Sequence, residues 1–358
     1  MTPGAQAPFF SVIVTAYRRR TFLREAVQSV LDQTLPRSDV EIIVVKDFAD
    51  PEIDGWLAGL GPSVTNVTED LPRIGQMFVR GLDLARGEVF CFLDDDDRFR
   101  PEKLAGLQTL YRADRSLGLV RNSYYAIDAD GRPVPSWEGF RPQPPTSVTW
   151  GPGRSGVRFP WLYRYGGYIN ESTISIRTAV ARRWIRWLNQ VVASCDIALF
   201  TVALASDVGV RVENARWNDY RVHLSTSHPA IVEGNEALDL RDVKRSLQTA
   251  EVLRSAVASA PGHQAALRMS ESFRLEAAVT AFLLDPTASL SFANWVRFAR
   301  TVVWRRQAYL GALWFYCLRR WARPAGAVRA YRARRHGDLR RAAAAATSRA
   351  AAVPGPRP

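Results

Sequence analysis

The sequence has few cysteines, and their placement argues against a disulfide framework. Cys91, Cys195 and Cys317 are widely separated, form no CxxC pair and have no metal-ligand spacing. Cys91 lies in an apolar run, where it is most simply a small buried side chain. A reducing, cytoplasmic compartment is therefore expected.

A secretory signal and a long apolar run are also missing. Residues 1–8 contain no basic region, and the apolar run that follows has the length of a strand. The stretch Gln307–Leu318 has 12 residues, whereas a membrane-spanning helix needs about 20. Two interpretations of it stay open: a buried helix, or a helix in the membrane interface with Trp304, Trp314 and Trp321 at headgroup depth.

The first 290 residues have no excess of positive charge. The whole chain carries +13, but residues 291–358 contain 15 Arg and one Asp, or +14, so the preceding residues sum to −1. The arginines near the C-terminus predict contact with an anionic membrane surface. Their interleaving with tryptophan favours such a surface over nucleic acid.

What the sequence does contain is enough apolar residues for a core, arranged as alternating strands and helices. The hydrophobic fraction is 47%, which argues against disorder. Buried strands are predicted at residues 9–15, 40–45, 63–67 and 88–93, separated by helices after Thr21, at 51–60 and at 74–85. Thr21 is expected to cap the first helix. Strands connected by helices predict parallel βαβ units.

The middle of the chain is less regular, and the end is mostly helical. A helix is expected to begin at Pro101, a strand at 117–127, a turn at 128–131 and a long loop at 141–156. Strands at 171–176 and 208–212 and helices at 178–188 and 196–205 follow. From about residue 231 the pattern is helical.

Four consecutive aspartates, Asp94 to Asp97, follow the strand predicted at 88–93. Four adjacent carboxylates repel one another unless a cation neutralises them, which indicates a divalent metal bound with an anionic substrate. A solvated acidic turn is the alternative interpretation. Alternation along a continued strand would place Asp94 and Asp96 on one face and turn Asp95 away.

Two further polar clusters follow predicted strands. Thr15, Ala16 and Tyr17 end the first strand, and Lys46 and Asp47 end the second. Ligands of open parallel sheets bind outside the carboxyl ends of the strands. The three clusters are therefore expected at one rim.

These motifs together resemble glycosyltransferase family 2. The resemblance lies in Ser11–Tyr17, Ala26–Thr34, Glu41–Asp47 and Leu93–Asp97, and covers about residues 9–225. It implies a GT-A fold, an α/β class with a Rossmann-like, mostly parallel sheet flanked by helices and a helical C-terminal extension. The expected division is a glycosyltransferase domain at 1–228 (donor half 1–103, acceptor half 104–228), a helical region at 229–323 and a partly disordered basic tail at 324–358.

The resemblance also implies a donor site for a nucleoside-diphosphate sugar, with a UDP-sugar favoured, and a Mg²⁺ or Mn²⁺ ion. The residues that match donor-binding positions are Thr15, Ala16, Tyr17, Asp47, Asp94 and Asp95, with Arg73 in place of a missing basic residue. The expected metal ligands are Asp94, Asp96, Asp97 and His223. The metal would stabilise charge on the departing nucleoside diphosphate.

An inverting enzyme of this kind needs a base that takes the proton of the acceptor hydroxyl. The expected acceptor is a glycan or glycolipid. The segment Ser194–Phe200 resembles the family's base position and makes Asp196 the candidate, with Glu171 in reserve. The segment Tyr220–His223 resembles a Tyr-Arg-x-His motif, which suggests that Arg221 pairs with the pyrophosphate. Residues 166–171 are expected to line the acceptor site.

Two alternatives stay open. Lys46–Asp47–Phe48 lacks one acid and a glycine of the usual family motif, which suggests a catalytically degenerate sugar-nucleotide-binding protein with a basic tail. A nucleotidyltransferase is disfavoured, because no glycine-rich phosphate loop follows Tyr17. The expected location is cytoplasmic, at the inner face of the cell membrane.

Overall fold

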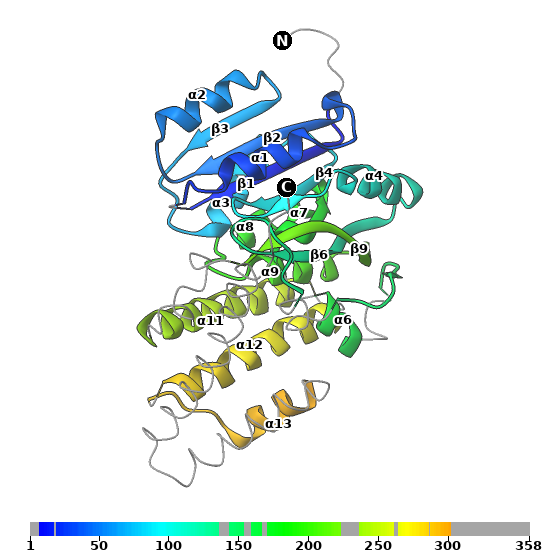
Figure 1. Cartoon of the computed structure of the whole chain (residues 1–358). Coiled ribbons are helices and arrows are strands. Elements are labelled where there is room, and N and C mark those ends of the chain that lie inside the picture. The colour runs from blue at the N-terminus through cyan, green and yellow to red at the C-terminus, as the bar shows by residue number, and fades with distance from the viewer. Residues whose placement is uncertain are drawn as a thin grey trace, which may run out of the picture.

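A computed structural model describes residues 7–17, 19–135, 143–153, 159–166, 170–222, 236–260, 264–285 and 287–301. These residues form an α/β unit around one mixed sheet, with helices on both of its faces (Figure 1). The strand order is β3-β2-β1-β4-β8-β6-β9-β5, and β7 pairs with β9 beside this path.

The N-terminal half of the sheet is parallel. Its strands are β1 (Phe10–Ala16), β2 (Val40–Lys46), β3 (Val64–Thr68) and β4 (Val89–Asp94). The connecting helices are α1 (Leu23–Leu31), α2 (Pro51–Gly59) and α3 (Ile74–Leu84). This order confirms the βαβ units predicted from the alternating pattern.

The second half of the sheet is mixed. Strand β8 (Ile174–Arg177) is antiparallel to both β4 and β6 (Leu117–Ile127), and β6 is parallel to β9 (Gly209–Arg221). The short strands β5 (Arg98–Phe99) and β7 (Val148–Trp150) are antiparallel to β9. Helix α4 (Lys103–Ala113) connects β5 to β6.

Side-chain alternation along the central strands divides the core between the two faces of the sheet. Val12, Val14 and Leu93 pack with α1, α2 and α4. Ile13 and Phe92 pack on the opposite face with α3, α7 (Thr178–Arg183), α8 (Ile185–Leu188) and α9 (Cys195–Leu204). All ten residues of α9 are buried.

The same core continues into the C-terminal helices. Helices α11 (Glu236–Ala258) and α12 (Gln264–Leu284) lie beside each other below the sheet, and α13 (Phe292–Thr301) follows them (Figure 1). Leu253 and Phe273 belong to one buried cluster with α9 and the sheet. The α/β class and the helical C-terminal region are thus confirmed, while the predicted domain limits stay a prediction.

Several local predictions need correction. Helix α1 begins after Phe22, and no side chain caps its N-terminus, so Thr21 is not the cap. Residues Glu171–Thr173 form a 3₁₀ turn, η2, rather than the start of a strand. Helix 178–188 is divided into α7 and α8, β7 lies inside the predicted loop, and β9 is longer than expected.

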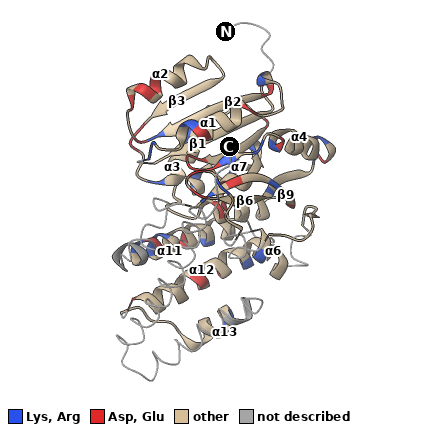
Figure 2. Ribbon diagram, in the orientation of Figure 1, with Lys and Arg blue, Asp and Glu red and all other residues tan. Residues whose placement is uncertain are grey.

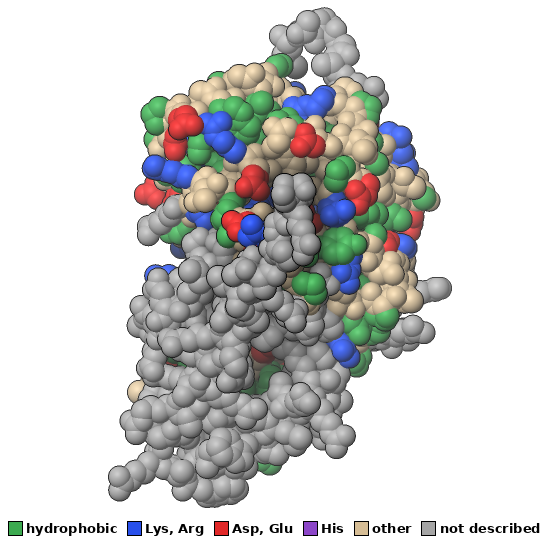
Figure 3. Space-filling view, in the orientation of Figure 1, with side chains coloured by type: hydrophobic (Ala, Val, Ile, Leu, Met, Phe, Trp, Pro, Cys, Tyr) green, Lys and Arg blue, Asp and Glu red, His purple; other side chains and the backbone are tan. Residues whose placement is uncertain are grey.

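Charges of both signs occur throughout the part of the chain that is described. Figure 2 shows acidic and basic positions on the sheet half and on the helices below it. On the coloured part of the face in Figure 3, acidic, basic and apolar side chains are interspersed. No helix among the described residues is long and apolar enough to cross a membrane. The predicted tail and the stretch 307–318 lie outside the described residues.

Candidate active site

The carboxyl ends of the three central parallel strands meet at one rim. In the sheet register Thr15 on β1 lies between Val45 on β2 and Asp94 on β4. The backbone of Thr15 accepts a hydrogen bond from the N–H of Asp95 (3.2 Å), and that of Ala16 accepts one from Asp47 (3.3 Å). The structure therefore brings together the three polar clusters that are distant in the sequence.

Three of the four aspartates form a compact group of oxygen ligands. Asp94, Asp96 and Asp97 each offer a carboxylate oxygen, and these oxygens lie within 4.8 Å of one another. Hard oxygen donors of this kind suit Mg²⁺ or Mn²⁺. Burial, together with repulsion from neighbouring acids, raises the pKa of Asp94 well above its usual range and that of Asp97 to about 7. Both shifts show that ionising these crowded carboxyls is costly, and a bound cation would offset that cost.

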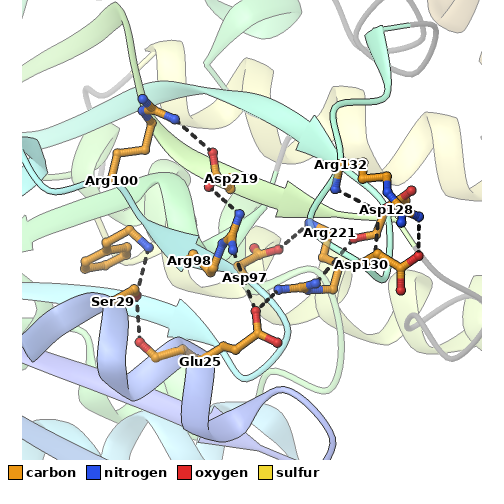
Figure 4. A network of polar contacts seen from close by, with 12 residues as sticks. Glu25, Ser29, Asp97, Arg98, Arg100, Asp128, Asp130, Arg132, Asp219 and Arg221 are labelled. Carbon is orange, nitrogen blue, oxygen red and sulfur yellow. Dashed lines mark hydrogen bonds and ion pairs between the residues drawn. The ribbon is translucent and has the colours of Figure 1, made fainter. Parts of the chain in front are cut away.

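Asp97 is fixed by neighbours from other elements. Its carboxylate accepts hydrogen bonds from the side-chain amide of Asn170 and, at 2.9 Å, from the backbone N–H of Arg221. Figure 4 shows Asp97 and Arg221 in the middle of a network that joins α1, β5, β9 and the turn after β6. The rotamer of Asp97 is therefore set by the fold before any ligand binds.

The side chain of Arg221 points into this network rather than toward a diphosphate. Its guanidinium donates to the backbone oxygens of Asp96 (2.8 Å) and Ala129 (2.7 Å) and pairs with Glu25 (2.6 Å). It also lies over the ring of Phe22, and Arg221 is only 1% exposed. The predicted pairing of Arg221 with a pyrophosphate is therefore wrong in this structure.

Asp95 is bound by a cation from the neighbouring strand end. Arg19, which follows β1, forms a two-pronged contact with the carboxylate of Asp95. One nitrogen of the same guanidinium lies 2.8 Å from the carboxylate of Asp96. Although Arg19 is close, burial raises the pKa of Asp95 to about 7. Asp95 thus turns toward Arg19, whereas Asp94, Asp96 and Asp97 form the ligand group.

A second pair of acids lies beside the first group. Glu171 in η2 accepts the backbone N–H of Cys195 (3.2 Å) at the N-terminus of α9, one residue before Asp196. Burial, followed by repulsion from Asp196, raises the pKa of Glu171 to about 8. Glu171 also contributes to the raised pKa of Asp94. Glu171 therefore lies within electrostatic reach of Asp94, and Asp196 lies within electrostatic reach of Glu171.

The remaining predicted donor residues occupy varied positions. Thr15 and Ala16 are buried, Tyr17 is 48% exposed and Asp47 is half-buried at the rim. Arg73 is exposed at the start of α3, where its backbone N–H donates to the side chain of Gln76 (3.2 Å). His223 lies outside the described residues.

Two buried lysines connect separate elements of the fold, which the sequence did not indicate. Lys46 is fully buried at the end of β2, where its ammonium contacts Asp54 (2.8 Å) and Thr68 (2.6 Å). Lys103 donates to the backbone of Ser172 (2.6 Å) and to Asn218 (2.8 Å), and burial lowers its pKa to about 7. Lys103 belongs to no motif, and the motif that contains Lys46 does not indicate its contact with Asp54, so only the three-dimensional fold shows which elements the two lysines join.

Comparison with known proteins points to one enzyme family. Residues 11–166 match the model of the family described as "Glycosyl transferase family 2". The putative glycosyltransferase EpsH of Bacillus subtilis is 29% identical over 100 residues, which is 27% of this chain and 28% of that protein. The putative teichuronic acid biosynthesis glycosyltransferase TuaG of Bacillus subtilis is 30% identical over 135 residues, which is 36% of this chain and 51% of that protein.

These matches are partial, and the chain spans less than two thirds of the length of either relative. Among solved structures, the chain aligns with the mannosyltransferase PcManGT from Pyrobaculum calidifontis in complex with GDP-Man and Mn²⁺. The TM-score is 0.49, the identity is 16%, and the alignment covers 89% of this chain and 88% of that one. Both relatives are named as putative glycosyltransferases.

Proposed function

Residues 11–166 belong to glycosyltransferase family 2, and from this membership we propose that the protein is an inverting, metal-dependent glycosyltransferase. It moves a sugar from a nucleoside-diphosphate sugar to an acceptor hydroxyl. The observation that carries the proposal is the group of Asp94, Asp96 and Asp97 oxygens at the rim of the parallel strands. These residues fit Mg²⁺ or Mn²⁺ because all three ligands are carboxylate oxygens.

The chain's own residues supply positioning and proton transfer. Thr15, Tyr17 and Asp47 surround the nucleotide at the ends of β1 and β2, and the three aspartates hold the metal. Bound there, a divalent ion neutralises the charge of the departing diphosphate. Asp97 is held in place by contacts with Asn170 and the backbone of Arg221, so its carboxylate needs little reorganisation on binding.

Asp196 is the proposed base. Its carboxylate takes the proton of the acceptor hydroxyl while that oxygen bonds to the anomeric carbon. The bond from that carbon to the diphosphate oxygen breaks, and the nucleoside diphosphate leaves with the electron pair from the opposite face. Glu171 is the alternative base, but its carboxylate accepts the N–H of Cys195 and is committed to the start of α9.

The donor and acceptor follow from the same proposal. A UDP-sugar is favoured as donor, and a glycan or glycolipid of the cell envelope as acceptor, in keeping with the name of the relative TuaG. The arginine-rich residues after 290 are proposed to hold the protein on the anionic inner face of a membrane. Loss of sedimentation with anionic vesicles on truncation after Leu290 tests this contact.

The proposal is tested on the aspartates directly. Asp94→Asn and Asp96→Asn are expected to reduce Mn²⁺-dependent turnover of a UDP- or GDP-sugar by at least about 100-fold, because each removes a charged ligand. Asp83→Asn, on the exposed side of α3, is the matched control and should leave turnover unchanged. Wild-type turnover in both variants would refute the metal site.

A catalytically degenerate binding protein is the second candidate. It is favoured by Lys46, which occupies the end of β2 in place of a family acid and is fully buried against Asp54. Such a protein would bind UDP or GDP with Mn²⁺ but release no nucleoside diphosphate from any donor sugar. Slow donor hydrolysis by the wild-type chain would exclude this candidate.

A further inference from the structure

A positively charged side chain, that of Arg19, lies against the aspartate run. Arg19 binds Asp95 through two nitrogens and reaches Asp96 at 2.8 Å with one of them. Its side chain is 19% exposed, so water still reaches part of it at the rim. Three of the four aspartates contribute to the raised pKa of Arg19, which keeps it charged at any working pH. A fixed positive charge thus lies beside the group of ligand oxygens.

Among the described basic residues near the rim, Arg20, Arg73 and Lys46 do not share this arrangement. Arg20, the next residue, is 61% exposed and lies 3.5 Å from Asp50 on another part of the rim. Arg73, which the sequence suggested as the replacement cation, is exposed at the start of α3. Lys46 is buried in its contact with Asp54.

We propose that Arg19 is the diphosphate-binding cation of the donor site and that Asp95 positions it. Without ligand, Arg19 neutralises Asp96 and so competes with the metal for that carboxylate. When the metal and a nucleoside diphosphate bind together, the guanidinium leaves Asp96 and binds a phosphate oxygen. Asp95 keeps its two contacts with the guanidinium. Planar guanidinium groups suit this exchange because carboxylate and phosphate oxygens fit the same fork.

The inference rests on the proposed function. It predicts that one variant has different effects on metal affinity and on nucleotide affinity. Arg19→Gln removes a competing positive charge, so Mn²⁺ alone should bind the variant as tightly as the wild type, or more tightly. The same variant loses one charge-assisted contact, so UDP or GDP should bind in the presence of Mn²⁺ about tenfold more weakly. General damage to the site would weaken both affinities.

The experiment measures binding rather than turnover. Free Mn²⁺ is followed by its electron paramagnetic resonance signal, and UDP and GDP binding by calorimetry, on the full chain and its variants. Arg19→Lys should recover part of the nucleotide affinity. Arg20→Gln and Arg112→Gln, the latter on the exposed side of α4, are the matched controls and should match the wild type in both assays. Asp95→Asn should weaken nucleotide binding, although by less than Arg19→Gln.

Each possible result supports or overturns the proposed role of Arg19. Weaker nucleotide binding with undiminished Mn²⁺ binding in Arg19→Gln, with both controls unchanged, supports the proposal. Equal nucleotide affinity in Arg19→Gln and the wild type overturns the role of Arg19 and leaves the glycosyltransferase proposal intact. Parallel loss of Mn²⁺ and nucleotide binding also overturns it, because Arg19 would then only hold the loop. Absence of Mn²⁺-dependent UDP and GDP binding in the wild type overturns both proposals.

Discussion

At the scale of single residues, the positions of the aspartates depend on residues outside the aspartate motif. Asp97 depends on Asn170 and on the backbone of Arg221, and the position of Asp96 depends on the Arg221 guanidinium. These partners come from other parts of the chain, more than 70 residues away. The acids supply the ligand atoms, and distant residues determine where those atoms point.

Arg221 provides the sharpest test of this dependence. Its guanidinium is buried and joins the Asp96 turn, the turn after β6 and Glu25 on α1 (Figure 4). A lysine cannot reach these separate acceptors together. We expect Arg221→Lys to lower the free energy of unfolding by about 2–4 kcal/mol, since buried acceptors lose their partners. Urea unfolding measures this loss, and Mn²⁺ binding should weaken in parallel.

The matched control is the partner of Arg221 at the surface. The side chain of Glu25 is 48% exposed, so Glu25→Gln removes its ion pairs with Arg221 and Arg98 but leaves a carboxamide that water can solvate. A change within about 0.5 kcal/mol is expected for this variant. If Arg221→Lys were equally mild, the network would not be holding the aspartates.

The sequence was most informative about residues that share a motif. The four aspartates, Thr15 and Asp47 could be assigned to one rim because parallel strands align their carboxyl ends. Arg19 could not be singled out, because a run of three arginines does not reveal which side chain turns inward. The Tyr220–His223 motif singled out Arg221 and suggested that it contacts a ligand. In the structure Arg221 is buried and contacts other parts of the chain instead.

At the scale of elements, η2 and α9 connect the aspartates to the base candidates. Glu171 caps the backbone of α9 through the Cys195 N–H, next to Asp196. The residue before the helix, Ser194, has a φ of 55°, in the left-handed region, so the chain turns sharply into α9. Sequence patterns predicted α9, but not this turn or η2, because both depend on contacts between segments.

The buried Glu171 makes stability depend on pH. Its pKa is 4.5 in an unfolded chain and about 8 in the folded one, so between these values the folded state binds a proton that the unfolded state does not. The free energy of unfolding should therefore fall as the pH rises from about 4.5 to about 8. Melting temperatures at pH 5.5 and 8, with chelator present, measure the effect.

Comparison with Glu171→Gln isolates this contribution. The variant cannot ionise, so its loss of melting temperature between the two pH values should be smaller than that of the wild type. A remaining slope is expected from Asp95 and Asp97, whose pKa values are raised in the same direction. Identical slopes in variant and wild type would mean that Glu171 is not protonated in the folded chain.

At the scale of the whole molecule, the C-terminal helices share the core of the α/β half. Phe273 on α12 is fully buried in the cluster that contains α9 and the inner face of the sheet. The sequence predicted a boundary near residue 228 because the pattern changes there from mixed to helical. Composition cannot show whether two such parts share a core, since that depends on which faces meet.

Truncation of Phe273 distinguishes one cooperative unit from two. We expect Phe273→Ala to destabilise the chain by about 3–5 kcal/mol, as a cavity would form beneath α9. Because α9 and the sheet that carries the aspartates share this core, the whole described region should unfold in one guanidinium transition, and Mn²⁺ binding should be lost in that same transition. Leu267→Ala on the same helix is the control, since Leu267 is 37% exposed. Two separate transitions, with Mn²⁺ retained through the first, would instead mean that the C-terminal helices unfold independently of the site.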